Sequence, residues 1–282
     1  MTAPAEVTRE DGGVSGNALP SRHAHLTRYA GWQLRDYLRE RGAATVIVTV
    51  LFALIGIAPG LKMINQRIAD SSAGLITRYG SVDAARATMV HDVSVSFVNG
   101  FIGSMVFLAA LLAMNGVVAN DRKLGYYRFL FSKPVAPPRY YGQLFVVNAA
   151  GALALITLMA LVYGVTVTHV LTLSFITGIA IVFLLYASIS FMLSAAVRLD
   201  WLSLIAVTVA STLLWGAFGA SSSPFSKLLY LLPPVHKTNE VYAAVADGTP
   251  LPWHTLEWIG GYAALCFAAG LIVLRYRRLA IK

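Results

Sequence analysis

The side chains best suited to metal binding are six histidines, which are scattered along the chain. A metal site needs three or more His, Cys or carboxylate ligands that converge on one ion. No two histidines have the His-x-x-x-His spacing that places ligands on one face of a helix, since they are His23, His25, His91, His169, His236 and His254. The pattern predicts no metal site and no other cofactor.

Covalent catalysis and ATP hydrolysis also lack their usual motifs. Ser221–Ser223 form a serine run, but no Gly-x-Ser-x-Gly surrounds a nucleophile, and a polar cap at a helix end explains the run. The lone Cys266 has no disulfide partner in the chain. No Gly-x-x-x-x-Gly-Lys-Ser/Thr phosphate loop is present. We predict that the chain is not an enzyme and that any ATP hydrolysis belongs to a separate subunit.

Residues 119–140 form the richest candidate site, because they mix charged, aromatic and apolar side chains. Asp121–Phe131 is long enough for two or three helical turns, which the following prolines would end. Aromatic and Arg side chains together are typical of hot spots in protein interfaces. The segment offers Tyr126, Tyr127, Arg128, Phe129 and Phe131. We predict a short helix that docks on a partner protein; the alternative is that the aromatic rings anchor the segment at the lipid interface.

The elements that position this segment are apolar helices. Of 282 residues, 57% are hydrophobic and 12% are charged, about half the charged share of a soluble domain. A membrane helix needs about 20 mostly apolar residues, and the stretches without Asp, Glu, Lys or Arg supply six such spans. The sequence predicts an all-α polytopic membrane domain over residues 43–282, with spans at about 43–61, 94–118, 141–165, 171–197, 201–221 and 255–274.

Basic residues set the expected orientation. With both termini inside, 16 of the 22 Lys and Arg residues fall on the cytoplasmic side and six fall outside. Positive residues accumulate on the cytoplasmic side of membrane proteins. We therefore predict a multi-pass protein of the cell membrane with both termini and the 119–140 segment in the cytoplasm. The same bias explains most of the net charge of +9 without a nucleic-acid partner.

The N-terminal region divides into two parts. Residues 1–21 are rich in Gly, Ala, Pro and acidic residues and are predicted to be disordered. Residues 22–42 form an expected amphipathic helix, with Leu26, Leu34 and Leu38 on one face and Arg28 and Arg35 on the other. A basic amphipathic helix before a first span typically lies in the membrane interface, near anionic lipid.

The outer segment 222–254 is too long for a simple turn. Phe225–Leu232 is apolar but too short to span, and Pro233 and Pro234 end it. Val235–Ala246 follows as a second short helix. This pattern predicts a hairpin that dips into the outer leaflet and returns. Apart from Glu257 at the start of the last one, the predicted spans contain no charged residue, which disfavours an ion-coupled transporter and favours passage of a hydrophobic or amphipathic substrate.

At residues 119–142 and 231–234 the sequence resembles the permeases of ABC-2 type (type V) ABC exporters. Members of that family tend to carry an acidic, Gly-containing segment, then Ser-x-Pro-Val, then a basic and an aromatic residue. Here these parts are Asp121 to Gly125, Ser132-Lys133-Pro134-Val135 and Arg139-Tyr140-Tyr141-Gly142. Leu231-Leu232-Pro233-Pro234 is similar to the family's outer re-entrant hairpin. The resemblance covers about residues 22–282.

The resemblance implies a permease that pairs with separate ATPase subunits and forms a homodimer, or a pair with a related permease. It implies a re-entrant hairpin at Leu232, Pro233 and Pro234. It places ATPase docking at Asp121, Gly125, Tyr126, Arg128, Phe129, Ser132, Pro134, Val135, Arg139 and Tyr140. The leading hypothesis is thus an ATP-driven exporter subunit. A structural or assembly subunit of a larger membrane complex, and a membrane enzyme, stay open as alternatives.

Overall fold

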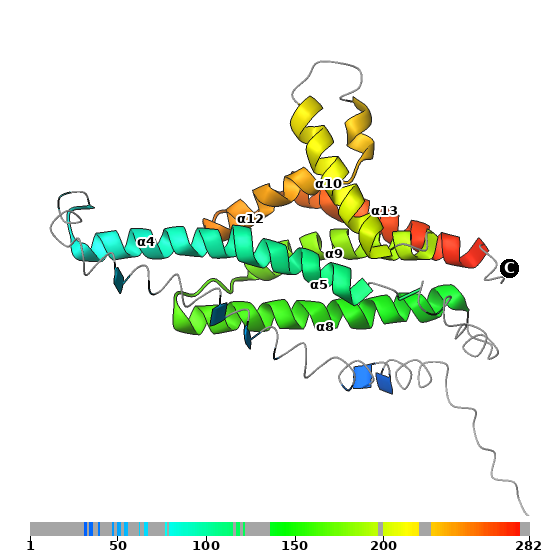
Figure 1. The fold of residues 1–282 in the computed structure, drawn as a ribbon, viewed down its shortest axis with the longest axis horizontal. Helices are drawn as coiled ribbons and strands as arrows, with labels where there is room; N and C mark the ends of the chain where they lie inside the picture. The colour runs from blue at the N-terminus through cyan, green and yellow to red at the C-terminus, as the bar shows by residue number, and fades with distance from the viewer. Residues whose placement is uncertain are drawn as a thin grey trace, which may run out of the picture.

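The computed structural model describes residues 79–114, 117, 118, 121, 136–196, 200–219 and 227–276, with isolated positions between residues 31 and 77. All regular structure in these ranges is helical, which confirms the predicted all-α class for this part of the chain (Figure 1). The elements are α4 (Val82–Ser96), the π-helical η2 (Phe97–Ile102), α5 (Gly103–Met114), α8 (Pro137–Thr166), α9 (Leu173–Ala196), α10 (Asp200–Phe218), the 3₁₀ turns η3 (Leu229–Leu231) and η4 (Val235–Lys237), α12 (Thr238–Ala246) and α13 (Trp253–Tyr276).

Four helical stretches in the described residues are long and apolar enough to cross a membrane. They are Val82–Met114, Pro137–Thr166, Leu173–Ala196 and Trp253–Tyr276, and they match the spans expected at 94–118, 141–165, 171–197 and 255–274. The span expected at 201–221 corresponds to α10, whose apolar part, Leu202–Phe218, is shorter. Apart from isolated positions, the expected span 43–61, the 22–42 helix and the 1–21 tail lie outside the described residues.

The helix that contains the second expected span begins at Val82, twelve residues before the expected start at residue 94. Ser81 caps the start of α4, because its side-chain oxygen accepts a hydrogen bond from the amide of Ala84 at 3.1 Å. Gly80 precedes the cap with a φ of 79°, a conformation that favours glycine. The continuous helix Val82–Met114 has 33 residues, and about 20 suffice to cross a membrane. Its first turns, which carry Asp83 and other exposed charged side chains, therefore extend beyond the apolar part.

The helix changes its hydrogen-bonding pattern at η2, between α4 and α5. π-helical turns are rare and occur mostly as single insertions in α-helices. At this point Phe97 stacks on Tyr163 of α8, with 3.8 Å between ring centroids. One turn before it, the hydroxyls of Ser94 and Tyr163 share a hydrogen bond of 2.9 Å. Tyr163 thus fastens the second long helix to α8.

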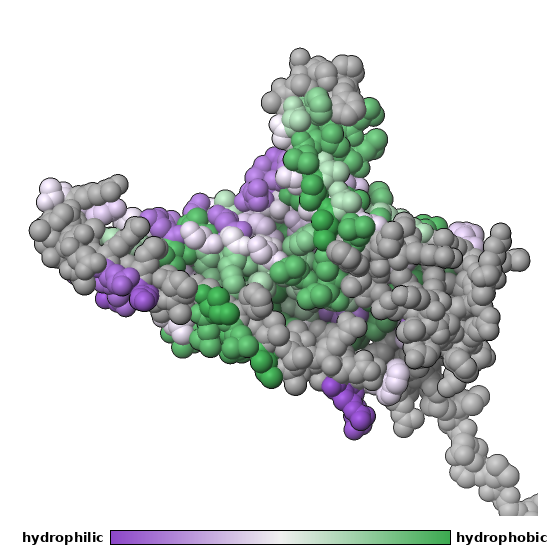
Figure 2. All heavy atoms as spheres, viewed as in Figure 1, coloured by the Kyte–Doolittle hydropathy of each residue, from purple (hydrophilic) through white to green (hydrophobic). Residues whose placement is uncertain are grey.

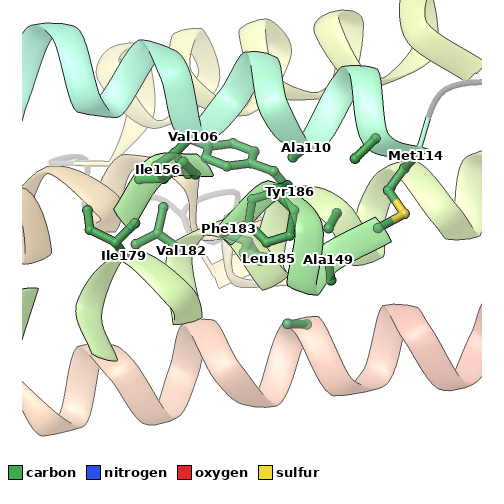
Figure 3. Packing of buried hydrophobic residues seen from close by; sticks show 14 of the residues in the cluster. Val106, Ala110, Met114, Ala149, Ile156, Ile179, Val182, Phe183, Leu185 and Tyr186 are labelled. Atoms are coloured by element: carbon green, nitrogen blue, oxygen red, sulfur yellow. The ribbon is translucent and has the colours of Figure 1, made fainter. Parts of the chain in front are cut away.

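Helix α9 lies at the centre of the packed helices. Figure 3 shows its side chains, among them Val182, Phe183 and Leu185, between α5 and α13. Most of its length is buried, and Phe183 and Leu185 are completely so. The approach to α13 is close, since a Cβ added at Gly270 would lie 2.8 Å from the ring of Phe191. A helix that is apolar all round fits such a central position.

Helix α10 packs against α9 near its start, where Leu204 is completely buried, but it does not run alongside the other long helices. Figure 1 shows it inclined to the direction shared by α5, α8, α9 and α13, and its upper end projects from them together with η3. Hydrophobic residues cover this arm, whereas hydrophilic residues gather near α12 and the start of α4 (Figure 2). Leu213 of α10 and Leu231 of η3 are 66% and 74% exposed. In water such a surface would be unfavourable, which fits a membrane environment.

Candidate functional site

The two ends of the 119–140 segment meet in the structure. The hydroxyl of Tyr141 on α8 donates a hydrogen bond to Oδ2 of Asp121 at 3.1 Å. Tyr141 is completely buried, and its ring packs edge-on against Tyr140, with centroids 5.0 Å apart. The segment therefore leaves the second long helix and returns to α8 at nearly the same place. This hydrogen bond therefore links the residues that follow the second long helix to the start of α8.

Two further hydrogen bonds tie the same end of the molecule to α8 and α9. The amide of Val118 donates to the hydroxyl of Ser194 on α9 at 3.3 Å. The buried side-chain amide of Asn148 on α8 donates to the carbonyl of Ala113 on α5 at 3.1 Å. Such bonds between helices are the usual role of polar side chains in apolar spans. The end of the second long helix is thus fixed to both neighbours.

Burial changes the acidity of Asp121. Partial burial raises the pKa of its carboxyl group above the ordinary value, and the hydrogen bond from Tyr141 opposes this shift. Burial penalises the charged carboxylate because water solvates it less well there. Asp121 therefore binds a proton more readily than a carboxyl group in water does.

Three of the ten residues predicted for docking lie in the described part of the chain. Asp121 is half-buried, Arg139 is exposed, and Tyr140 is buried against Tyr141. The seven outside the described residues are Gly125, Tyr126, Arg128, Phe129, Ser132, Pro134 and Val135. Docking at this segment stays a prediction. The supporting residues Tyr141 and Ser194 were not predicted, because no spacing in the sequence relates them to Asp121 or Val118.

The proline pair that follows the segment begins α8. Pro137 and Pro138 occupy its first turn, where a missing amide hydrogen costs nothing because the first amides of a helix have no partner within it. The prolines therefore stiffen the exit of the segment as the first turn of a 30-residue helix. α8 begins four residues before the expected span at 141–165.

The predicted hairpin residues Leu232, Pro233 and Pro234 form the corner between η3 and η4. The amide of Val235 donates to the carbonyl of Pro233 at 2.7 Å, and Pro233, Pro234 and Val235 are buried. The hydroxyl of Tyr262 on α13 donates to the carbonyl of Leu231 at 3.2 Å. The corner is therefore a packed turn held against α13; its entry into a membrane leaflet stays a prediction.

Four aromatic side chains from four elements meet beside this corner, and we call them the aromatic cluster: Trp215 of α10, Tyr230 of η3, His236 of η4 and Trp258 of α13. The imidazole of His236 stacks on Trp215 with 3.9 Å between centroids, and Tyr230 stacks on Trp258 at 5.5 Å. The two stacks meet edge to face, with Trp215 at 5.4 Å from Tyr230 and His236 at 5.8 Å from Trp258. Such ring pairs stabilise by about 0.5–1.5 kcal/mol each.

The start of α12 is fixed to α13 by a carboxylate. Glu240 accepts hydrogen bonds from Lys237 and from the hydroxyl of Thr255, the latter at 2.8 Å. Partial burial acts to raise the pKa of Glu240, but these two hydrogen bonds and the charge of Lys237 together lower it below the ordinary value. At the other end of α12, Asp247 pairs with His91 of α4 at 3.8 Å. α12 is therefore tied to the second and last long helices.

Tyr242 on α12 is wedged into the helix interface. Its ring would lie 3.2 Å from a Cβ at Gly103 of α5. Its hydroxyl is buried and has no hydrogen-bond partner among the described residues. Burial, with a smaller effect of Tyr186, raises the pKa of Tyr242 well above the ordinary value, so this hydroxyl stays protonated.

The arrangement is suited to mechanical linkage between elements. In the described residues, no group of three His, Cys, Asp or Glu side chains could hold a metal ion. The features that do converge are hydrogen bonds and ring stacks that join one helix to another. Comparison with protein-family models and with curated proteins finds no match to this chain.

Proposed function

We propose that the chain is the permease subunit of an ATP-driven ABC-2 type exporter. It moves a hydrophobic or amphipathic substrate by a conformational change that separate ATPase subunits drive. The 119–140 segment docks on the ATPase, and the hairpin at Leu232–Pro234 is re-entrant in the outer leaflet. All six spans, both termini in the cytoplasm, location in the cell membrane and assembly as a homodimer or with a related permease belong to this proposal.

The observation that carries the proposal is the hydrogen bond between Asp121 and Tyr141. It joins the two ends of a segment rich in the residues of protein interfaces, between the second long helix and α8. A partner bound to the segment would therefore act on both helices and, through Val118 and Ser194, on the central α9. The apolar helices themselves support a role within a membrane.

The test is a double change within the segment, Arg128→Ala with Phe129→Ala. Truncation of hot-spot side chains typically costs about 2 kcal/mol or more, which is about 30-fold in affinity. Tagged full chain should copurify with a protein that contains a phosphate-binding loop, and vesicles that contain both should hydrolyse ATP. We expect the double variant to lose both properties while it still inserts into the membrane.

A matched control is Arg275→Ala with Tyr276→Ala. This pair is likewise an Arg followed by an aromatic residue, with the guanidinium 5.9 Å from the ring centroid, and it lies at the end of α13 outside the 119–140 segment. The control should retain ATPase binding. Equal binding by both variants would contradict docking at 119–140, and a stable complex without any ATPase would favour the assembly-subunit alternative.

A further inference from the structure

His236 occupies a position that holds the hairpin to two long helices. It follows the corner at Pro233 and Pro234, and its ring stacks on Trp215 of α10 and meets the edge of Trp258 of α13. Its element η4 leads directly into α12. The imidazole is therefore one of two rings, with Tyr230, through which residues 229–246 contact both α10 and α13.

Both ring nitrogens of His236 are buried, and neither has a hydrogen-bond partner among the described residues. The indole nitrogen of Trp215 is also buried and has no hydrogen-bond partner among the described residues. A neutral imidazole has one N–H group, whereas the protonated ring has two and a full positive charge. Protonation in the closed cluster would therefore place a charge and two donors where the described residues supply no acceptor, which is unfavourable.

The charged groups around the ring do not remove this penalty. Lys237 is next to His236 and repels a positive imidazolium, while Glu240 on α12 attracts it but is already bound to Lys237 and Thr255. Tyr230 of η3 is the other titratable member of the cluster. α10 has no charged residue between positions 202 and 218, and Glu257 beside Trp258 is exposed. A cation is attracted to the face of Trp215, but the pKa of His236 still lies below its ordinary value of 6.5, chiefly because of burial.

We propose that His236 is a proton-sensitive latch, which holds the 229–246 hairpin against α10 and α13 while the imidazole is neutral and releases it when the ring gains a proton. This inference goes beyond the proposed function, because it concerns a property of the chain without any ATPase. It would regulate the hairpin in response to the pH of the compartment that this end of the molecule faces.

The direction of the pH effect follows from the lowered pKa. In an open hairpin the ring meets water, and its pKa returns toward 6.5. The open state therefore binds a proton more readily than the closed state does, so acid favours opening. The closed state has its full stability above about pH 6.5 and loses it as the pH falls through and below that value. Each unit by which the pKa is lowered shifts the equilibrium about tenfold toward the open state.

Cysteine accessibility at Val235 tests the latch in lipid nanodiscs. Val235 is 6% exposed and lies next to His236 in η4. In a Cys266→Ala background, labelling of V235C is compared with labelling of N239C, an exposed position on α12 that corrects for the pH dependence of the thiol reaction. We expect the ratio of V235C labelling to N239C labelling to be low at pH 8 and to rise several-fold by pH 5, with the midpoint of the rise below pH 6.5.

Two substitutions of His236 identify the group that titrates. His236→Phe keeps a flat ring for stacking on Trp215 but binds no proton, so the ratio should stay low at every pH. His236→Gln also binds no proton. The labelling ratio in this variant should be the same at every pH, whether it is high or low. The matched control is His254→Gln, which removes an exposed histidine of α13 outside the cluster and should behave as the parent protein does.

A second readout needs no introduced cysteine. Release of the stack removes the imidazole from the face of Trp215, so tryptophan emission of the unmodified chain should shift between pH 8 and pH 5. The shift should be reversible and absent in H236F. An accessibility ratio that is the same at pH 8 and pH 5, or a rise that persists in H236F and H236Q, would overturn the latch.

Discussion

Asp121 shows how a single carboxylate can be both a structural link and a source of instability. Its hydrogen bond with Tyr141 closes the 119–140 segment, yet its partial burial raises the pKa of the carboxyl group. A raised pKa in the folded state means that the protonated form is favoured there. The contribution of the Asp121 carboxyl group to the free energy of unfolding is therefore complete below its ordinary pKa of 3.8. It is lost as the pH rises through the higher pKa of the folded state.

The substitution Asp121→Asn should separate these two effects. The amide oxygen of Asn can still accept from Tyr141, but the buried charge is gone. We expect thermal stability at pH 7 in detergent to be unchanged or higher than in the parent chain, and the dependence of stability on acidic pH to weaken. A clear loss of stability at pH 7 would show that the ionised carboxylate itself is required.

Tyr141→Phe tests the other partner of the same bond. It removes the donor and leaves Asp121 half-buried without it, which should lower stability by about 1–3 kcal/mol. Thermal unfolding of the purified chain measures this loss. Tyr276→Phe, which changes a tyrosine that is 75% exposed, should cost little, and equal losses in the two variants would contradict the role of the Asp121 contact.

At the scale of single residues, the sequence indicates which side chains are unusual but not which of them meet. Asp121 stands out because it begins a charged and aromatic segment. Tyr141, twenty positions later, looks like one more aromatic residue at a span end. The aromatic cluster was not predicted at all, since its members come from four elements and no periodicity relates Trp215 to His236 or Trp258.

Among the helices, α9 and α13 lie especially close together at Gly270. Of the described glycines, this one has the least room for a Cβ between two long helices. A methyl group at Gly270 would lie 2.8 Å from Phe191 and 3.3 Å from the Cα of Met192. Because backbone atoms are involved, the helices cannot adjust by rotating one side chain. The small residue is therefore needed for packing rather than for backbone freedom.

Gly270→Ala should therefore destabilise the chain, typically by about 1–3 kcal/mol for an overpacked core position. Gly261→Ala on the same helix provides the matched control, since a Cβ there meets nothing within 4 Å. That change should stabilise by about 0.5–1 kcal/mol, because alanine favours helix more than glycine does. Thermal unfolding of both variants in one detergent is the measurement, and a neutral Gly270→Ala would show that the interface can widen.

Element positions could be predicted where apolar length is the deciding property. The stretches around 141–165, 171–197 and 255–274 coincide with α8, α9 and α13 within four residues. The start of α4 was missed, because Asp83, Arg86, His91 and Asp92 interrupt the apolar pattern while a capped helix tolerates them. η2 could not be predicted, since a π-helical turn depends on packing against neighbours and has no composition of its own.

At the scale of the whole molecule, the expected topology places the two ends of the long helices on opposite sides of the membrane. The expected topology places Asp83 of α4 and Asn239 of α12 outside and Tyr276 of α13 inside, and all three side chains are exposed. Single cysteines at positions 83 and 239 should react with an impermeant maleimide added to intact cells. A cysteine at position 276 should react only after lysis. Labelling of position 276 in intact cells would overturn the orientation.

The inclined arm formed by α10 has a consequence for the surrounding lipid. If α10 is the fifth span, its 19 residues, Asp200–Phe218, are about 28 Å long, whereas the hydrocarbon core of a bilayer is about 30 Å thick. Because α10 is inclined to the other long helices, the thickness of membrane that it crosses is smaller still. Lipid beside the arm must thin to match it, at a cost of fractions of a kcal/mol per Å. The protein would accordingly prefer thinner membranes, and an amphipathic molecule that crosses beside α10 would meet a thinner hydrocarbon barrier there than elsewhere.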